Sequence, residues 1–315
     1  MADAKSPRDL QIVDPVLTNI ARAFKPSGFI ASDILPIIPV DVDAGQYPVF
    51  DGFFDDDADN KVSDRAVTPE VDFEFSTDQY LCEDYRLKAT ITKKEERNAH
   101  GAVRLRQNKL DVVLTRMAIR RERRAADLLR KTTNGGQLTL GAAPSNNWNV
   151  DAATIETDIK TGATAVYSAT GMSTNTIVIP YLVAYEIAMQ QDIREIVKYT
   201  VNGQDVLRVG DGLLPSVLHG HKVVIPKGAL RNTAAEGATR SLSEIWGDHV
   251  RLLHVPEGGG GWGIPATGYT FQSEPEVVDR WKDNDPPVEN IRAWESKDEK
   301  VCAPSLGYEI ASVLS

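Results

Sequence analysis

The sequence predicts an α+β fold of about two domains, and three features of the 315-residue chain lead to this prediction. Residues 71–76 and 85–92 alternate apolar and polar side chains, as half-buried strands do. Residues 102–131 carry apolar side chains at three- and four-residue spacing, which indicates one long amphipathic helix. Residues 150–256 mix short apolar runs with helical periodicity, as an α/β domain does.

The bulk composition bounds the class of protein. Hydrophobic residues make up 42% and charged residues 25% of the chain, which is ordinary for a globular protein with real cores. No run reaches the roughly 18 apolar residues of a membrane span, and residues 1–15 lack the apolar stretch of a signal peptide, so we expect a cytoplasmic protein. Two cysteines, Cys82 and Cys302, are too few for a disulfide framework or a four-cysteine zinc site.

Residues 1–40 are predicted to form an extended arm. Five prolines interrupt any longer helix in this stretch, namely Pro7, Pro15, Pro26, Pro36 and Pro39. One short helix is expected from Pro15 to about Ala23, with Asp14 as its N-cap and Pro15 at the first helical position. Such an arm buries little against itself, so it must lie on its own body or on a neighbouring molecule.

Residues 45–92 are predicted to form strands around a long acidic loop. The run GQYPVF is a short strand, and residues 53–70 are polar and acidic. Two alternating runs follow, one with Val71, Phe73 and Phe75 on a face, the other with Tyr85, Leu87, Ala89 and Ile91 on a face. We therefore expect a long two-stranded projection with an acidic tip, which needs a surface to lie on because an isolated hairpin is marginally stable.

The strongest helix signal covers about residues 102–131. Its apolar face consists of Leu110, Val113, Leu114, Met117, Ala125 and Leu128. Val112 and Ile119 fall on the opposite side, so we expect the helix to be contacted from two directions. No Pro or Gly occurs between Gly101 and Gly135, and about thirty residues at 1.5 Å rise make a rod of about 45 Å.

The second half of the chain is predicted to alternate helices and short strands. Asp151 or Thr154 caps a helix to about Tyr167, and Pro180 stands at the first position of a helix over residues 181–199. HKVVIP and HVRLLHVP are expected strands, with a loop over residues 228–241 between them. A glycine-rich loop precedes residues 268–315, which are predicted to form two or three strands with a turn at DNDPP.

Charge is strongly segregated along a chain whose formal net charge is -10. Residues 41–84 hold fourteen Asp or Glu against two basic residues, a balance of -12, whereas residues 98–131 hold ten Lys or Arg against three acids, a balance of +7. The basic run has three interpretations: a solvated helix face, a nucleic-acid contact, or a surface that receives an acidic segment of another copy. The third gains weight because one homo-oligomeric chain supplies both halves of an interface.

We predict that the contacting side chains are Asp55, Asp56 and Asp57 on one copy and Arg120, Arg121, Arg123 and Arg124 on another. Arg121 and Arg124 also project near the apolar stripe, so their stems should cross packed surface and their head groups should seek carboxylates. The acidic balance of the whole chain disfavours tight wrapping of nucleic acid.

The usual catalytic and metal-binding patterns are absent from the sequence. We find no GxSxG, HExxH or P-loop pattern, and GGGGWG lacks the flanking strand, helix and lysine of a phosphate loop. His219 and His221 form the one close histidine pair, but no carboxylate or cysteine cluster stands beside them. The DDDADN run lacks the glycine and distal glutamate of a calcium loop. We therefore expect no catalytic residue, no metal and no cofactor.

The order of the expected elements resembles that of the HK97-type major capsid proteins of tailed phages. Residues 83–131 resemble the strand and spine helix, including the spacing of Arg121, Glu122 and Ala126, and NTIVIPYLVAYEIAMQQDIREIVKYT resembles the central strand and helix of the axial domain. SLSEIWGDHVRLLHVP, PATGYTF and DEKVCAPSLGYEIASVL resemble the exit of that domain and the closing strands. Together these stretches cover most of residues 40–315.

The resemblance implies five regions and a set of partners. The regions are an N-terminal arm at 1–40, an extended hairpin loop at 41–84, a peripheral domain with the spine helix at 85–149, an axial domain at 150–267, and return strands to the peripheral domain at 268–315. It also implies hexamers and pentamers of an icosahedral virion shell around double-stranded DNA bound without sequence specificity, assembled in the host cytoplasm, with a separate scaffolding protein, a portal and a decoration protein as further partners and no membrane. Some capsids of this fold crosslink a loop lysine to an asparagine, which here would pair Lys61 with Asn284 or Asn290.

Three other hypotheses stay open at this point. An encapsulin-like bacterial compartment shares the fold and differs in what it encloses. A soluble α/β enzyme would need a catalytic group beside His219, His221 and the glycine-rich loop. A minor capsid or decoration subunit fits poorly with a long helix followed by an α/β domain.

Overall fold

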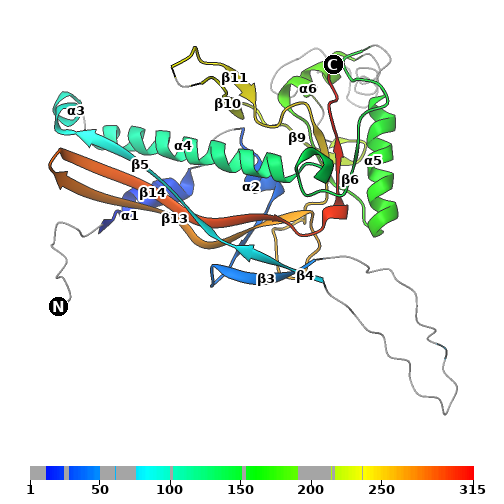
Figure 1. Cartoon of the computed structure of the whole chain (residues 1–315), viewed down its shortest axis with the longest axis horizontal. Helices are drawn as coiled ribbons and strands as arrows, with labels where there is room; N and C mark the ends of the chain where they lie inside the picture. Colours follow the sequence, from blue (N-terminus) through cyan, green and yellow to red (C-terminus); the bar gives the residue numbers. More distant parts are fainter. Residues whose placement is uncertain are drawn as a thin grey trace.

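The computed structural model describes residues 12–24, 28–49, 61, 76–99, 102–150, 154–190, 214, 217–235 and 237–315. These residues form an elongated molecule, with a long sheet and one long helix extending side by side from a more compact part that is built on a second sheet (Figure 1). The fold therefore combines helices and sheets, as the α+β prediction has it.

The long sheet has five strands and is built around an antiparallel ribbon. β13 (Gly268–Asn284) pairs with β14 (Pro287–Val301), and β14 pairs with β5 (Glu83–Thr92). Two short strands of the arm, β1 (Ile12–Val13) and β2 (Ile37–Pro39), pair with β13. The alternation predicted for residues 85–92 is confirmed, because Ile91 is buried and Lys88 on the other face is exposed.

The described part of the N-terminal arm lies on its own body. α1 (Pro15–Ala23) begins as predicted, with Asp14 accepting hydrogen bonds from the backbone N–H groups of Val16 and Leu17, and it buries Leu17 and Ala21 against the sheet. After α2 (Ala31–Ile34), β2 joins β13. Of the two alternatives for the arm, the structure thus supports self-coverage for residues 12–24 and 28–40.

The long helix α4 (Ala102–Leu128) packs on β14 and β5 and is preceded by α3 (Lys93–Asn98), whose N-cap Thr92 and Glu95 form a capping box. Its predicted apolar face is buried from Leu110 to Ala125, whereas Val112 is exposed. Contact from a second direction occurs further along the helix, where buried groups meet α2 and the second sheet: Glu122, Ala126 and Leu129.

α4 ends three residues before the predicted boundary at residue 131. The chain turns there through a short 3-10 helix, η2 (Thr132–Asn134), and Gly135 adopts φ +82°. The turn is stabilised because the buried Arg251 side chain of the second sheet donates hydrogen bonds to the carbonyl oxygens of Ala126 and Leu129 at the end of the helix.

A separate hairpin leaves the long sheet near its junction with the compact part. β3 (Ala44–Val49) and β4 (Ser76–Leu81) pair antiparallel, and Tyr47 and Tyr80 stack against Phe271 of β13. The two-stranded projection is thus confirmed at its base. Its predicted continuation at Val71, Phe73 and Phe75 and its acidic tip lie outside the described residues.

The second sheet has six strands, in the order β6 (Leu140–Ala142), β15 (Gly307–Ile310), β12 (Val250–Leu253), β7 (Thr176–Val178), β9 (His221–Val224) and β8 (Val217–Leu218). α5 (Ile155–Thr170) and α6 (Tyr181–Met189) pack on one face, where Gly162 allows close approach to Leu252 and Tyr308. The end of α4 and the arm pack on the other face, against Val178 and Leu253.

Several boundaries differ from the sequence prediction. Pro180 is the N-cap of α6 rather than its first residue, and the helix ends at Met189 because Gln190 is extended, while residues 191–200 lie outside the description. The expected loop at 228–241 was wrong in part, since it contributes β10 (Leu230–Asn232), which pairs with β11 (Leu242–Glu244).

The expected region boundaries also do not coincide with the sheets. β6 lies before position 150 and β15 after position 267, yet both pair within the six-stranded sheet. The segment at 268–315 therefore serves both sheets, returning to the long one with β13 and β14 and closing the compact one with β15.

Candidate functional site

The four arginines predicted to receive an acidic partner fall into two classes in the structure. Arg124 donates from Nε and Nη2 to the two carboxylate oxygens of Glu299, both at 2.8 Å, and its guanidinium lies 3.7 Å from the centre of the Tyr85 ring. Arg121 lies with its Nε 3.8 Å from the same carboxylate. Both head groups thus have a carboxylate of their own chain, as their position near the apolar stripe predicted.

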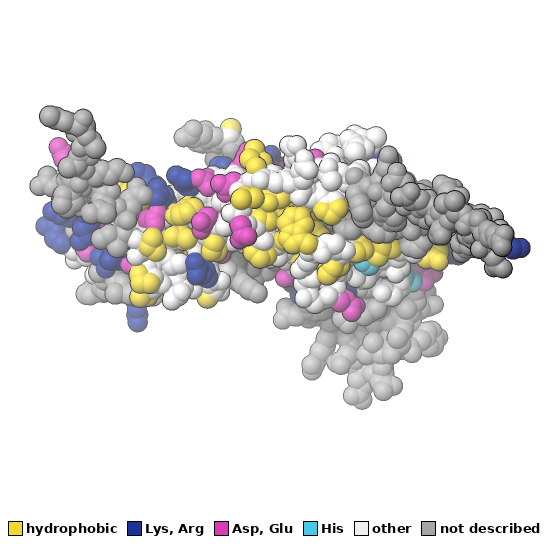
Figure 2. Space-filling model, turned by 90° about the horizontal axis from the view of Figure 1, so that it is seen from below, with side chains coloured by type: hydrophobic (Ala, Val, Ile, Leu, Met, Phe, Trp, Pro, Cys, Tyr) yellow, Lys and Arg dark blue, Asp and Glu magenta, His cyan; other side chains and the backbone are white. Residues whose placement is uncertain are grey.

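Arg120 and Arg123 lie on the outer face of α4 and are exposed. Arg123 forms an ion pair with Asp127 at 3.5 Å, one turn along the helix, while no ion pair of Arg120 occurs among the described residues. Seen from below, basic side chains gather toward the end of the long sheet, and hydrophobic side chains lie nearer the middle of the molecule (Figure 2). The exposed arginines are therefore the ones accessible to another molecule.

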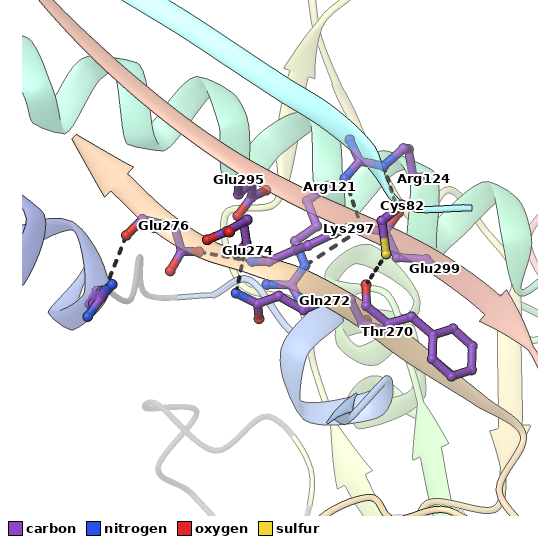
Figure 3. A network of polar contacts seen from close by, with 12 residues as sticks. Cys82, Arg121, Arg124, Thr270, Gln272, Glu274, Glu276, Glu295, Lys297 and Glu299 are labelled. Carbon is purple, nitrogen blue, oxygen red and sulfur yellow. Dashed lines mark hydrogen bonds and ion pairs between the residues drawn. The ribbon is translucent and has the colours of Figure 1, made fainter. Parts of the chain in front are cut away.

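A buried row of alternating charges runs along β14 beneath α4 (Figure 3). Lys297 is 1% exposed and donates to Glu295 at 2.6 Å and to Glu276 of β13 at 3.0 Å. Burial raises the pKa of Glu276. Burial acts in the same direction on Glu295, but Lys297, the hydrogen bond with Glu276 and Arg121 together lower the pKa of that carboxyl. Together with Glu299, Arg121 and Arg124, this gives three carboxylates and three cations, of which Glu276 and Arg124 are half-buried.

Glu122 joins three parts of the molecule at a single buried carboxylate. Its two oxygens accept the backbone N–H groups of Ile30 and Ala31 at 3.0 and 2.9 Å, at the start of α2, and Oε1 also accepts from Trp246 Nε1 at 2.7 Å. Burial raises the pKa of Glu122, against the opposing effect of these donors. Helix α4, the N-terminal arm and the compact part are therefore connected through the Glu122 side chain.

The end of α4 is held by a second buried charge. Arg251 of β12 donates to the carbonyl oxygens of Leu129 at 2.8 Å and Ala126 at 3.1 Å, and its guanidinium packs on the Trp246 ring at 4.8 Å. A cation at this position complements the negative end of the helix dipole. Burial lowers the pKa of Arg251 to about 10, which leaves it charged at neutral pH.

Glu309 of β15 is the third buried charge at this junction. It is fully buried and accepts from the Lys131 backbone N–H at 2.7 Å and from Asn134 Nδ2 at 2.8 Å. The segment that leaves α4 is therefore fixed to the six-stranded sheet by hydrogen bonds to a charged group, which are the stronger kind. Together Glu122, Arg251 and Glu309 form what we call the junction cluster.

The other residues singled out from sequence show no catalytic arrangement. His221 is buried and contacts Thr174 at 2.7 Å, while His219 lies 3.6 Å from Glu156. Among the residues that the structure describes, no three His, Cys, Asp or Glu are grouped to hold a metal. Within the same ranges no helix is long and apolar enough to cross a bilayer.

The remaining predicted contact residues are only partly placed. Asp55, Asp56 and Asp57 lie outside the described ranges, so their contact with a second copy stays a prediction. Of the two asparagines considered for a crosslink, Asn290 is 1% exposed and donates to Asp283, while Asn284 is exposed at the end of β13. A lysine of a neighbouring copy would reach only Asn284.

Sequence reasoning did not single out Arg251, Glu309 or Lys297, because a charged residue in a strand is normally assigned to the solvated face. A signal was present for the row on β14. Glu295, Lys297 and Glu299 recur at two-residue spacing, so they must share one face of a strand whose neighbours Ile291 and Ala293 face the core.

The similarity to known proteins extends over nearly the whole chain and is not confined to one motif. No family model matches it. The major capsid protein of Burkholderia phage BcepMu is 22% identical over 96% of this chain and 97% of its own length. A phage-related protein from Bordetella bronchiseptica has a similar structure, with a TM-score of 0.73, 20% identity and coverage of 97% and 98% of the two chains. The capsid of cyanophage P-SCSP1u gives a TM-score of 0.62 at 11% identity over 98% and 92%.

Proposed function

We propose that this chain, which has the HK97-like fold of phage capsid proteins, is the major capsid protein of a tailed phage and assembles with copies of itself into the shell of the virion. The observation that carries the proposal is agreement along nearly the full length with a phage major capsid protein. The same agreement makes the chain a structural protein rather than an enzyme. The chain then functions through its contacts with other copies, because many weak interfaces together hold a shell closed.

The proposal has finer parts, which the resemblance to HK97-type capsid proteins supports. The copies form hexamers and pentamers of an icosahedral shell around double-stranded DNA, assembled in the host cytoplasm with a separate scaffolding protein, a portal and a decoration protein. The acidic balance of the chain supports a container, because packaged DNA then does not adhere to its wall.

Self-assembly is tested by expressing the chain with and without a scaffolding protein and examining it by sedimentation and negative-stain electron microscopy. We expect large closed particles. A chain that remains a monomer or a small oligomer under all these conditions would contradict the shell function. Closed particles that hold a protein cargo and no nucleic acid would instead support the encapsulin-like alternative.

The contact between copies is proposed to join Asp55, Asp56 and Asp57 of one chain to the basic face of α4 in a neighbour. Arg120 and Arg123 are the proposed contact residues because they are exposed. Arg121 and Arg124 already face Glu299 of their own chain, which would compete with the incoming carboxylates for them. Exposed pairs are screened over about 10 Å at 0.1 M salt, so this contact weakens as salt rises.

A charge-reversal experiment tests this contact. The triple variant D55K/D56K/D57K is expected to yield fewer particles at low salt, and R120E/R123E in the same chain is expected to restore part of the yield. The matched control is E257K/E274K/D285K, which reverses three exposed acids that lie outside residues 41–84 and 98–131. Equal particle yields for the two triple variants at low salt would contradict a contact between these aspartates and α4.

A further inference from the structure

His249 occupies a half-buried position where the end of α4 meets the compact part of the molecule. Its Nε2 lies 2.9 Å from Nη2 of Arg130, two residues after α4, and its Nδ1 lies 3.3 Å from Oε1 of Glu309 on β15. Its side chain is 14% exposed. The imidazole therefore stands between a cation that follows the helix and a carboxylate of the sheet.

Hydrogen-bond chemistry determines the state of this ring. A guanidinium only donates, so Nε2 must accept from Arg130 and the neutral ring carries its proton on Nδ1. The backbone N–H of Ser312 also approaches Nδ1, at 3.3 Å, but a neutral imidazole has one acceptor nitrogen and cannot serve both donors. A second proton, placed on Nε2, would leave Nη2 of Arg130 without this acceptor.

Two buried atoms beside the ring are arranged for an alternative pairing. Among the residues that the structure describes, Nε of Arg130 and Oε1 of Glu309 have no hydrogen-bond partner, and they lie 3.6 Å apart. Oδ1 of Asp248 lies 3.5 Å from Nε2 of His249, within reach of that nitrogen. A small displacement of Arg130 toward Glu309 would thus pair both orphaned atoms and release Nε2 to donate to Asp248.

We propose that His249 is a proton-operated switch, in which protonation of Nε2 moves Arg130 from the imidazole to Glu309 and pairs the imidazolium with Asp248. The proton comes from solvent hydronium, whose O–H bond breaks as the N–H bond at Nε2 forms, and no other covalent bond changes. The groups of charge around the ring belong to four segments: Asp127 on α4, Arg130 and Lys131 after it, Asp248 and Arg251 at β12, and Glu309 on β15.

The direction of the switch follows from its surroundings. Burial, with Arg251 and Arg130 nearby, lowers the pKa of His249 despite Glu309, so the ring takes up its second proton at a lower pH than an ordinary histidine does. The switch changes how the residue after α4 is attached to the sheet. It is a property of the single chain and does not depend on the proposed shell function.

Nuclear magnetic resonance of the full chain tests the switch, with the ring nitrogens of His249 and the Nε–H of Arg130 followed from pH 7.5 to pH 5. The Arg130 signal should shift with the same midpoint as His249, and its exchange with solvent should slow in acid as it pairs with Glu309. H249Q should abolish the Arg130 transition, whereas H254Q, at another histidine of the same part of the fold, should leave it unchanged.

A second variant keeps the proposal testable if H249Q does not fold. R130Q removes the cation that faces Nε2, from a side chain that is 31% exposed, and should raise the His249 midpoint by about one unit, a tenfold gain in proton affinity. An Arg130 signal that is constant with pH, or that titrates alike in H249Q, would overturn the switch. So would a His249 midpoint unaltered by R130Q.

Discussion

Glu122→Gln is expected to destabilise the fold by about 2–3 kcal/mol. The carboxylate is 1% exposed and accepts three hydrogen bonds, from Ile30, Ala31 and Trp246. A hydrogen bond to a charged group contributes about 1.5–3 kcal/mol, and a buried donor left unpaired costs about 1–3 kcal/mol. The amide keeps one acceptor oxygen and turns an NH2 group toward a donor, while removal of a buried charge offsets part of the loss.

Urea unfolding of the unassembled chain measures this effect. E257Q, at an exposed glutamate, is the control and should change the free energy of unfolding by less than about 0.5 kcal/mol. W246F removes one of the three donors, so the double variant E122Q/W246F should lose less than the sum of the two single losses. If E122Q unfolds at the same urea concentration as E257Q, the carboxylate does not hold the junction and this reasoning is wrong.

The pH dependence of Glu122 gives an independent check. Because burial raises its pKa in the folded state, the folded chain binds this proton more tightly than the unfolded chain does. Its contribution is therefore fully present below the ordinary value of 4.5 and is lost as the pH rises through the folded pKa. In E122Q that part of the pH profile should be flat.

Three further predictions concern the caps of two helices and one ion pair. Arg251→Met should destabilise the chain by about 3–5 kcal/mol in urea unfolding, since it leaves helix carbonyls unpaired; a loss below about 1 kcal/mol would contradict the cap. E299Q should cost about 1–3 kcal/mol by weakening the bidentate pair with Arg124, while D127N at an exposed ion pair should cost under about 0.5 kcal/mol; equal effects would count against the buried pair. Asp14→Ala should cost about 1 kcal/mol and speed hydrogen exchange in α1, and unchanged exchange would show that the cap is dispensable.

Local patterns predicted the elements that depend on nearby residues. The helix from Pro15 to Ala23 follows from its cap and its proline, and the face of β5 follows from period-two burial. The long helix was predicted because about thirty residues lack Pro and Gly. Its end was misplaced by three residues, since the stop depends on Arg251, a residue more than a hundred positions away.

Contacts between distant segments could not be predicted in this way. The pairing of β15 with β12 and of β6 with β15 assigns the last strand to the compact part, and no spacing in the sequence fixes it. The buried charges are the clearest case, because Glu122 and Lys297 look like solvated residues until their partners are known. The segregation of charge along the sequence indicated a contact between copies, and the part of Asp55, Asp56 and Asp57 in it remains a prediction.

If this chain builds a phage shell, as we propose, particles purified from the natural producer must consist of it. Electron microscopy of these fractions, with nuclease-protected nucleic acid assayed on the same material, should reveal closed icosahedral shells that contain double-stranded DNA. Fractions in which the chain occurs only as a monomer or small oligomer, or as closed shells filled with protein and free of nucleic acid, would contradict the claim.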